Sequence, residues 1–289
     1  MNALLHQILS GLATGGIYAS VALALVMIYQ ATHLVNFAQG ELAMFSTYIA
    51  WALIEAGVPY WGAFALTVVF AFVLGVVIER VIVRPVEDAP ILAIVIVFIA
   101  LLVIFNSMAG WIFTYTIKPF PSPFPTEPLF GNSYLSSHEL GSMGITLVVL
   151  LLLFVFFRFT PLGLAMRAAA QNPVSSRLVG IRVGWMLALG WGLAAAIGAV
   201  AGMMVAPTVF LEPNMMGGIL LYAFAGALLG GIDSPGGAVI GGFIVGVLEN
   251  VVGAYVGTEL KLTVALVLIV GVLVVRPSGM FGQVHVNRV

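Results

Sequence analysis

The sequence predicts an all-α polytopic membrane protein with about nine spans, arranged as two inverted four-helix repeats around a central span. Of its 289 residues, 62% are hydrophobic and only 7% are charged, whereas roughly 25% are charged in a soluble domain. Residues 1–40, 89–117 and 183–211 contain no Asp, Glu, Lys or Arg. Each run exceeds the ~20 residues that a helix needs to cross a bilayer. The runs lack the alternation of polar and apolar residues that membrane β-barrels show.

The first 113 residues form the predicted first repeat. Its four spans are expected at about residues 9–30, 40–56, 61–78 and 91–113. The first span has no basic residue before it, so we expect it to be retained rather than cleaved as a signal peptide. The sequence LVNFAQGE between the first two spans is rich in small and polar residues. It predicts an interruption of the helix at this point.

A proline-rich segment, residues 114–142, follows the first repeat. Its five prolines predict an extended segment outside the membrane. The fifth span, at about residues 143–157, is the central one.

The second repeat is predicted at residues 184–276. Its spans are expected at about residues 185–206, 216–232, 238–255 and 262–275. GGIDSPGG, between the seventh and eighth spans, is the counterpart of LVNFAQGE. Because a single span separates the two groups, the second is inverted relative to the first, an arrangement common in transporters. The alternative is that any nine-span protein can be divided in this way.

The basic residues sort by side and predict the orientation. Eight of the ten basic residues can lie in the cytoplasm together: Arg80, Arg84, the four arginines of residues 158–182, and the two C-terminal arginines. Only Lys118 and Lys261 are then outside, as the excess of basic residues in cytoplasmic loops predicts. The whole chain, residues 1–289, is then one transmembrane domain in the inner (plasma) membrane. Its N-terminus lies outside and its C-terminus lies in the cytoplasm.

Several function classes are disfavoured by the residues present. Neither lysine follows a glycine, so the sequence has no P-loop, and ATP would have to be bound by another subunit. The four histidines are scattered and there is no cysteine, so we expect no metal site and no disulfide. The few, clustered basic residues disfavour nucleic acid. We expect no catalytic residues and no cofactor, and therefore no enzyme.

Residues 158–182 carry four of the ten basic residues and no acidic residue. Within them, Asn172 can cap and Pro173 can begin a short helix over Val174–Val179, which Gly180 ends. A short helix on the cytoplasmic face, held by a span at each end, predicts a docking element for an intracellular partner. The alternative is an ordinary basic loop whose arginines contact only lipid phosphates.

Polar residues within the predicted spans are the candidates for a translocation pathway, because such residues usually face a cavity or a partner. They are Asn36, Gln39, Glu41, Asn106, Glu249 and Asn250. The alternative is hydrogen bonding between helices, which is favoured for the asparagines. Pairs of glycines spaced four residues apart predict close helix packing instead: Gly198 and Gly202, Gly226 and Gly230, Gly242 and Gly246, Gly253 and Gly257.

Three segments carry a resemblance to a known family. They are GLATGGIYASVALALVMIYQATHLVNFAQGE (11–41), TPLGLAMRAAAQNPVSSRLVGI (160–181) and AFAGALLGGIDSPGGAVIGGFIVGVLEN (223–250). The chain resembles the permease subunits of bacterial branched-chain amino-acid ABC importers, of the LivH type. These segments are less specific for substrate, since permeases for urea, short amides and other amino acids look similar.

The resemblance implies passage of Leu, Ile or Val into the cytoplasm and a set of partners: a second permease subunit, two cytoplasmic ATPases and a periplasmic substrate-binding protein. Residues Asn172–Gly180 would form the coupling helix in a groove of the ATPase. The residues that we assign to this contact are Arg167, Asn172, Pro173, Arg177 and Gly180. A rival class is an ion-coupled secondary transporter that uses Glu41 and Glu249. A polytopic membrane enzyme is a second rival, but no cluster of catalytic groups supports it.

Overall fold

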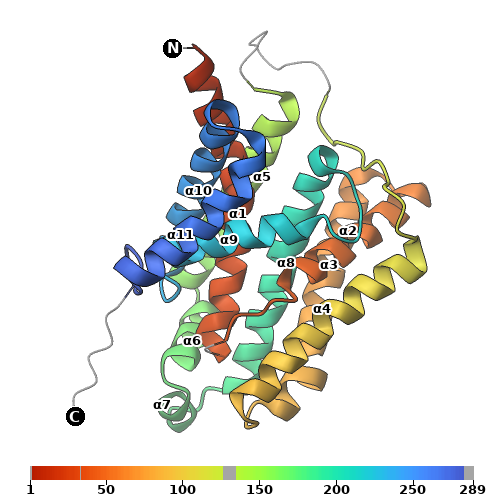
Figure 1. Ribbon diagram of the computed structural model, residues 1–289. Helices are drawn as coiled ribbons and strands as arrows, with labels where there is room; N and C mark the ends of the chain where they lie inside the picture. Colours follow the sequence, from red (N-terminus) through yellow and green to blue (C-terminus); the bar gives the residue numbers. More distant parts are fainter. Residues whose placement is uncertain (1, 33, 126–134, 283–289) are drawn as a thin grey trace. The chain divides into compact units, whose positions relative to one another are not determined.

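The computed structural model describes residues 2–32, 34–125 and 135–282, and these residues are predominantly helical (Figure 1). The α-helices are α1 (Asn2–Thr32), α2 (Gln39–Glu55), α3 (Tyr60–Ile78), α4 (Ile91–Phe113), α5 (Ser137–Phe159), α6 (Pro161–Gln171), α7 (Pro173–Leu178), α8 (Val183–Val209), α9 (Met216–Gly230), α10 (Pro235–Tyr255) and α11 (Lys261–Val275). Shorter turns are the π-helix η1 (Glu79–Val83), which continues α3, and the 3-10 helices η2 (Arg84–Val86) and η4 (Thr258–Leu260). The predicted all-α class is confirmed.

Seven helical stretches in the described residues are long and apolar enough to cross a membrane. They are α1, α3 with η1 and η2, α4, α5, α8, α10, and η4 with α11. Helices α2 and α9 have only 17 and 15 residues. Each of the nine predicted spans coincides with one of the seven long helical stretches or with α2 or α9. The chain is therefore a multi-pass α-helical membrane protein, while the count of nine crossings stays a prediction.

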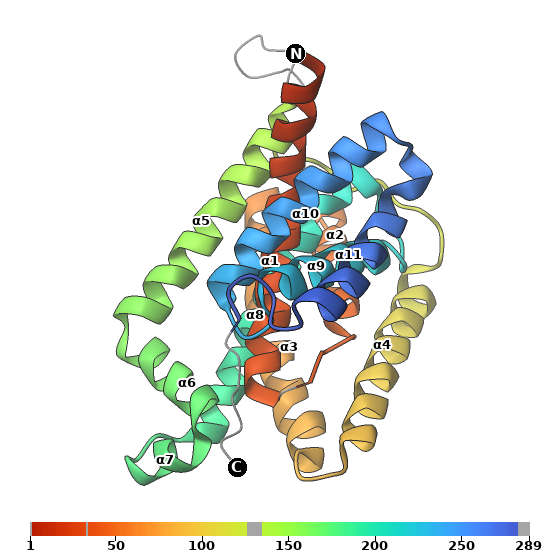
Figure 2. The ribbon, with the colours of Figure 1, turned by 60° about the vertical axis from the view of Figure 1, so that its left-hand side comes forward.

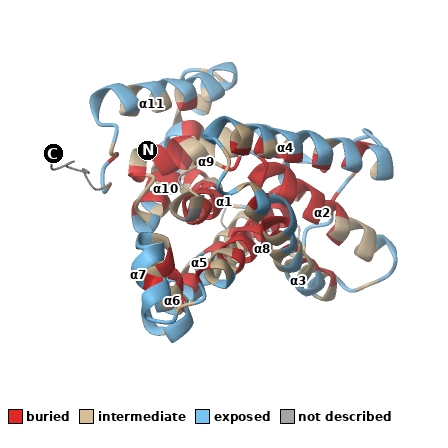
Figure 3. Cartoon of the chain, turned by 90° about the horizontal axis from the view of Figure 1, so that it is seen from below, coloured by how far each residue is buried: buried red, intermediate tan, exposed pale blue. Residues whose placement is uncertain are grey.

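Several helices carry exposed long apolar side chains, and α4 and α11 are coloured as exposed over much of their length (Figure 3). Leu92 and Trp111 on α4 are exposed, as are Val267 and Val274 on α11. A soluble monomer rarely leaves so large an apolar surface in water. These faces suit contact with lipid or with other membrane subunits.

The chain divides into two compact units. Unit 1 comprises the described parts of Met1–Val26, Phe124–Gly144 and Gly218–Val289, and unit 2 comprises Met27–Pro123 and Ile145–Gly217. Each unit thus joins segments that lie far apart in the sequence.

In unit 1, α1 packs against α10 through glycines on both helices (Figure 2). A side chain at Gly11 would meet the backbone of Val247 at 2.7 Å, and one at Gly246 would meet the backbone of Gly15. Helix α9 packs on α10 in the same way, since a side chain at Gly226 would lie 2.8 Å from the backbone of Gly242. Close backbone approach of this kind is the usual basis of helix association in membranes.

The pairing predicted for Gly253 with Gly257 is wrong. Gly257 follows the end of α10, has φ +152°, and has no atom within 4 Å of the position where a Cβ would stand. Its role is a left-handed turn between α10 and η4, a conformation that glycine adopts without steric cost.

In unit 2, α8 is the most buried helix and packs against both α2 and α3 through its glycines. Gly202 lies against α2, where a Cβ would be 2.9 Å from the carbonyl oxygen of Ala43. Gly75 of α3 lies against α8, where a Cβ would be 2.5 Å from the carbonyl oxygen of Trp191. These contacts leave no room for larger residues.

The Gly75→Leu variant should therefore be less stable by about 3 kcal/mol, the upper end of the range for overpacking, because a backbone carbonyl cannot rotate aside. The measurement is the temperature at which half of the detergent-solubilised protein is lost from the monodisperse fraction. Gly144→Leu is the matched control, since a Cβ at Gly144 meets nothing within 4 Å. Equal midpoints for the two variants would contradict this packing.

Both predicted interruptions are present, one in each unit. Residues 34–38 are not helical, and Asn36 Oδ1 accepts a hydrogen bond from the Ala38 N–H at 3.0 Å. Residues 231–234 separate α9 from α10, and Ser234 Oγ caps α10 by accepting from the Gly237 N–H at 3.1 Å. In each break a polar side chain satisfies backbone groups that the missing helix leaves free.

The proline-rich segment 114–142, predicted to be extended throughout, is helical in its last residues. Residues 114–125 are non-helical, with Lys118 and Leu211 exchanging two backbone hydrogen bonds of 3.0 Å. Residues 126–134 lie outside the described part, and α5 begins at Ser137 rather than at Met143. The reason is a capping box, in which Glu139 accepts from the Ser136 N–H at 2.8 Å while Ser136 Oγ accepts from the Glu139 N–H at 3.1 Å.

Candidate functional site

The short helix α7 forms as the sequence predicts. Asn172 is its N-cap, and its Oδ1 accepts a hydrogen bond from the Ser175 N–H at 2.9 Å. Pro173 occupies the first helical position, where its missing N–H costs nothing. Gly180 follows with φ +85°, the left-handed conformation that ends a helix. Three residues, Asn172, Pro173 and Gly180, thus determine where this helix begins and ends.

The outer face of α7 is apolar and exposed. Val174, Leu178 and Val179 are 69%, 84% and 76% exposed, and Ser176 is the one buried residue of the helix. Arg177 is also exposed. An exposed apolar face next to a cation is typical of a surface that another protein covers.

Helix α6 holds α7 in place at the end of α5. Thr160 caps α6 by accepting from the Gly163 N–H at 3.0 Å, and Met166 and Ala169 on α6 are buried. Arg167, by contrast, is half-buried on α6, and its Nε has no hydrogen-bond partner among the described residues. Arg167 is therefore less exposed than Arg177 of α7.

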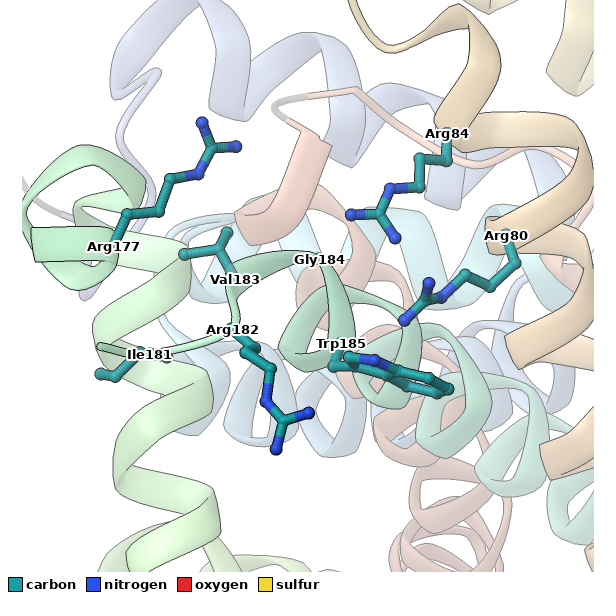
Figure 4. A pocket seen from close by; sticks show the side chains of 8 residues that line it. All are labelled: Arg80, Arg84, Arg177, Ile181, Arg182, Val183, Gly184 and Trp185. Carbon is teal, nitrogen blue, oxygen red and sulfur yellow. The ribbon is translucent and has the colours of Figure 1, made fainter. Parts of the chain in front are cut away.

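Four arginines line one pocket in unit 2. Arg177 of α7, Arg182 at the start of α8, and Arg80 and Arg84 after α3 line it together with Trp185 (Figure 4). Arg80 lies over the Trp185 ring, with 3.7 Å between its Cζ and the ring centroid. The cavity is about 350 Å³.

This pocket was not predicted as a site. The distribution of basic residues predicts that Arg80 and Arg84 lie on the same side of the membrane as Arg177. It does not predict how close these side chains are to one another. No sequence signal identified Trp185 as a partner of Arg80. Only the folding of α3 against α8 brings the two together.

Three of the candidate pathway residues in unit 2 come from α2 and α4. Asn106 donates to Glu41 Oε2 at 3.4 Å, to the Pro213 carbonyl at 3.0 Å and to Asn214 Oδ1 at 3.1 Å. Gln39 donates through Nε2 to the Ala194 carbonyl of α8 at 2.9 Å. The polar side chains thus bridge α2 to the helices and loop around it.

Asn36 and Gln39 retain unused hydrogen-bonding capacity. Both side chains are fully buried, and Asn36 Nδ2 and Gln39 Oε1 have no partner among the described residues. A buried polar atom without a partner costs about 1–3 kcal/mol. Each of these atoms can still bond to a partner that the described residues do not supply, such as a water molecule.

Glu249 and Asn250 belong to a separate cluster in unit 1. Lys261 Nζ lies 2.7 Å from Glu249 Oε1, and the Tyr18 hydroxyl and Asn250 Nδ2 donate to Glu249 Oε2 at 3.4 and 3.2 Å. Asn250 also donates to Thr14 Oγ1 at 3.3 Å. The carboxylate is paired with a cation, which favours the structural interpretation of this cluster.

The chain resembles named permeases along nearly its whole length. Residues 7–273 match the family described as branched-chain amino acid transport system / permease component. The high-affinity branched-chain amino acid transport system permease protein LivH of Escherichia coli (strain K12) is 31% identical over 300 residues, covering 99% of this chain and 97% of LivH. The corresponding protein BraD of Pseudomonas aeruginosa is also 31% identical, covering 99% and 98%. A probable LivH of Methanocaldococcus jannaschii is 28% identical, covering 91% and 87%.

Proposed function

Because this chain belongs to the family of permease components of branched-chain amino acid transport systems, we propose that it passes Leu, Ile or Val into the cytoplasm as part of an ATP-driven importer. The observation that carries the proposal is the match to permeases of this name over residues 7–273. The seven helical stretches of the described residues that are long and apolar enough to cross a membrane fit that role. The chain would lie in the inner membrane and carry out no covalent chemistry.

The proposed assembly contains a second permease subunit, two cytoplasmic ATPases and a periplasmic substrate-binding protein. Within it, α7 is the coupling helix. The exposed Val174, Leu178 and Arg177 would contact the ATPase, while Asn172 and Pro173 fix the start of the helix and Gly180 ends it. Closure of the ATPase pair on ATP would push α7, and α6 and α8 would carry the movement into the membrane. Arg167 is proposed to support α6 rather than to touch the ATPase.

The proposed topology has the N-terminus outside and the C-terminus in the cytoplasm, with nine spans. Residues 1–113 and 184–276 are the two inverted repeats, 114–142 is extracytoplasmic and 158–182 is the cytoplasmic coupling loop. The two interruptions at 34–38 and 231–234 support the repeats. The shared pocket of Arg80, Arg84, Arg177 and Arg182 supports the assignment of both basic segments to one side.

The proposed pathway follows the polar side of α2, at Asn36, Gln39, Glu41 and Asn106. The unused polar atoms of Asn36 and Gln39 support it. Glu249 and Asn250 were also candidates, but the ion pair with Lys261 supports a role in holding α1, α10 and η4–α11 together.

The function is tested by reconstituting the chain with its partner subunits in liposomes loaded with ATP. We expect uptake of labelled leucine that requires ATP and the binding protein, is competed by isoleucine and valine, and survives ionophores. Competition by urea or short amides instead would assign the chain to another substrate of the same family. Uptake that needs an ion gradient and no ATP would favour the secondary-transporter alternative.

A further inference from the structure

The arginine pocket of unit 2 has an excess of positive charge. Arg80, Arg84, Arg177 and Arg182 line it, and none of its lining residues is acidic. Glu79, which is buried, lies 3.7 Å from Arg80 Nε, and this is the one ion pair that the described residues make with any of the four arginines. Glu87 and Asp88 follow on the exposed loop after η2 and do not line the pocket. Four arginines and no acidic residue line the pocket, which favours binding of an anion.

The geometry of the donors suits a phosphate group. Arg84 and Arg177 extend toward one another from opposite sides of the pocket (Figure 4). Arg80 Nε and Nη2 are buried and have no hydrogen-bond acceptor among the described residues. Guanidinium groups bind phosphate oxygens in pairs of parallel hydrogen bonds.

Backbone groups add to this arrangement. Helix α8 begins at Val183 in the wall of the pocket, and no side chain caps it. The Val183 and Trp185 N–H groups donate to the Ile181 and Arg182 carbonyls at 2.9 and 3.0 Å. The start of α8 therefore contributes the positive end of its helix dipole, which attracts anions, rather than a set of free donors. A Cβ at Gly184 would collide with the Arg84 guanidinium, so the glycine lets this side chain lie against the start of α8.

The position of the pocket indicates where such a phosphate comes from. It lies at the end of the span Tyr60–Val86 and at the start of the span Val183–Val209. Span ends lie at the level of lipid headgroups, where Trp side chains such as Trp185 also concentrate. The same chemistry could be supplied by a soluble phosphate.

We propose that this pocket is a specific binding site for a phosphate group, supplied by an anionic phospholipid or by a soluble phosphate. The bound group would link Arg177 of α7 to Arg80 of η1 and Arg84 of η2, and so fix α7 relative to the end of α3. The site does not depend on the transported substrate or on the coupling role of α7.

The test uses the full chain in phosphatidylcholine nanodiscs titrated with phosphatidylglycerol, with retained lipid counted by native mass spectrometry. A second arm titrates inorganic phosphate and follows its ³¹P line broadening. The Arg84→Gln/Arg177→Gln variant should weaken binding at least about tenfold, since hydrogen bonds between charged groups are lost. Arg158→Gln, which removes an exposed arginine outside the pocket, is the matched control.

Gly184→Ala provides a second variant that keeps all four charges and displaces only the Arg84 guanidinium. It should also weaken binding, so a folding defect in the double variant cannot hide the effect. Lipid retention that depends on these residues identifies a lipid site, and line broadening alone that depends on them identifies a soluble phosphate. The proposal is overturned if neither probe distinguishes the double variant from Arg158→Gln. It is equally overturned if the arginines affect only co-purification of the ATPase, because they would then bind an acidic protein surface.

Discussion

Deleting Asn172–Gly180 should reduce ATP-driven leucine uptake to background while the protein stays in the membrane at wild-type levels. The physical reason is that α7 contributes almost nothing to its own unit, since five of its six residues are exposed. Its loss removes the exposed Val174 and Leu178 together with Arg177, which form the proposed contact with the ATPase. The measurement is uptake of labelled leucine in parallel with the amount of protein in the membrane.

The control for this deletion is Arg158→Gln, which changes an exposed arginine of the same basic loop outside α7. We expect it to retain uptake close to that of the wild type. ATP hydrolysis by the assembled complex should continue in the deletion variant but no longer respond to the loaded binding protein. Normal uptake by the deletion variant would remove the coupling role from α7.

Lys261→Met should lower the stability of the solubilised protein by about 3 kcal/mol, because it leaves the Glu249 carboxylate without its cation. Glu249 is buried, and the ion pair of 2.7 Å joins α10 to the start of α11. Glu249→Gln should cost less, because the amide can still accept from Tyr18 and Asn250, and the partly exposed Lys261 can reach water. The measurement is the midpoint of thermal loss of monodisperse protein.

The double variant Glu249→Gln/Lys261→Met completes a mutant cycle. The double variant should lose less stability than the sum of the losses of the two single variants, because the effects of changing two residues in direct contact are not additive. If both single variants have the same thermal midpoint as the wild type, the ion pair does not stabilise unit 1, and Glu249 is again a candidate for the pathway. Single variants that keep wild-type stability but lose uptake would also assign Glu249 to the pathway.

The helices were predictable because long apolar runs leave few alternatives in a membrane. The predicted spans differ from the observed helices mainly at their ends, where capping rather than hydrophobicity decides. Residues 136–139 show this: Ser136 and Glu139 form a capping box that lies outside the apolar run and starts the helix six residues before the predicted span. The start of α7 was predicted because Asn172 and Pro173 gave a local signal of the same kind.

The contacts between distant segments were not predictable. Glu249 was expected to face a pathway or to hold the bundle, and only the fold reveals Lys261 beside it. Arg80 meets Trp185 across more than a hundred residues of chain. A single sequence gives periodicity and charge along the chain, whereas these pairings depend on which helices share a surface. The same limit applies to Gly257, whose spacing from Gly253 predicts helix packing although the residue lies in a turn.

Helix α7 is proposed to receive the movement of a cytoplasmic ATPase, and a crosslink between the two proteins tests this most directly. The chain contains no cysteine, so Ser175→Cys places a single thiol on α7 without other changes. With the ATPase co-expressed, we predict a thiol-specific crosslink between the two proteins whose yield changes when ATP is added. A thiol that reacts with an impermeant reagent from outside intact cells, and never with the ATPase, would contradict the claim.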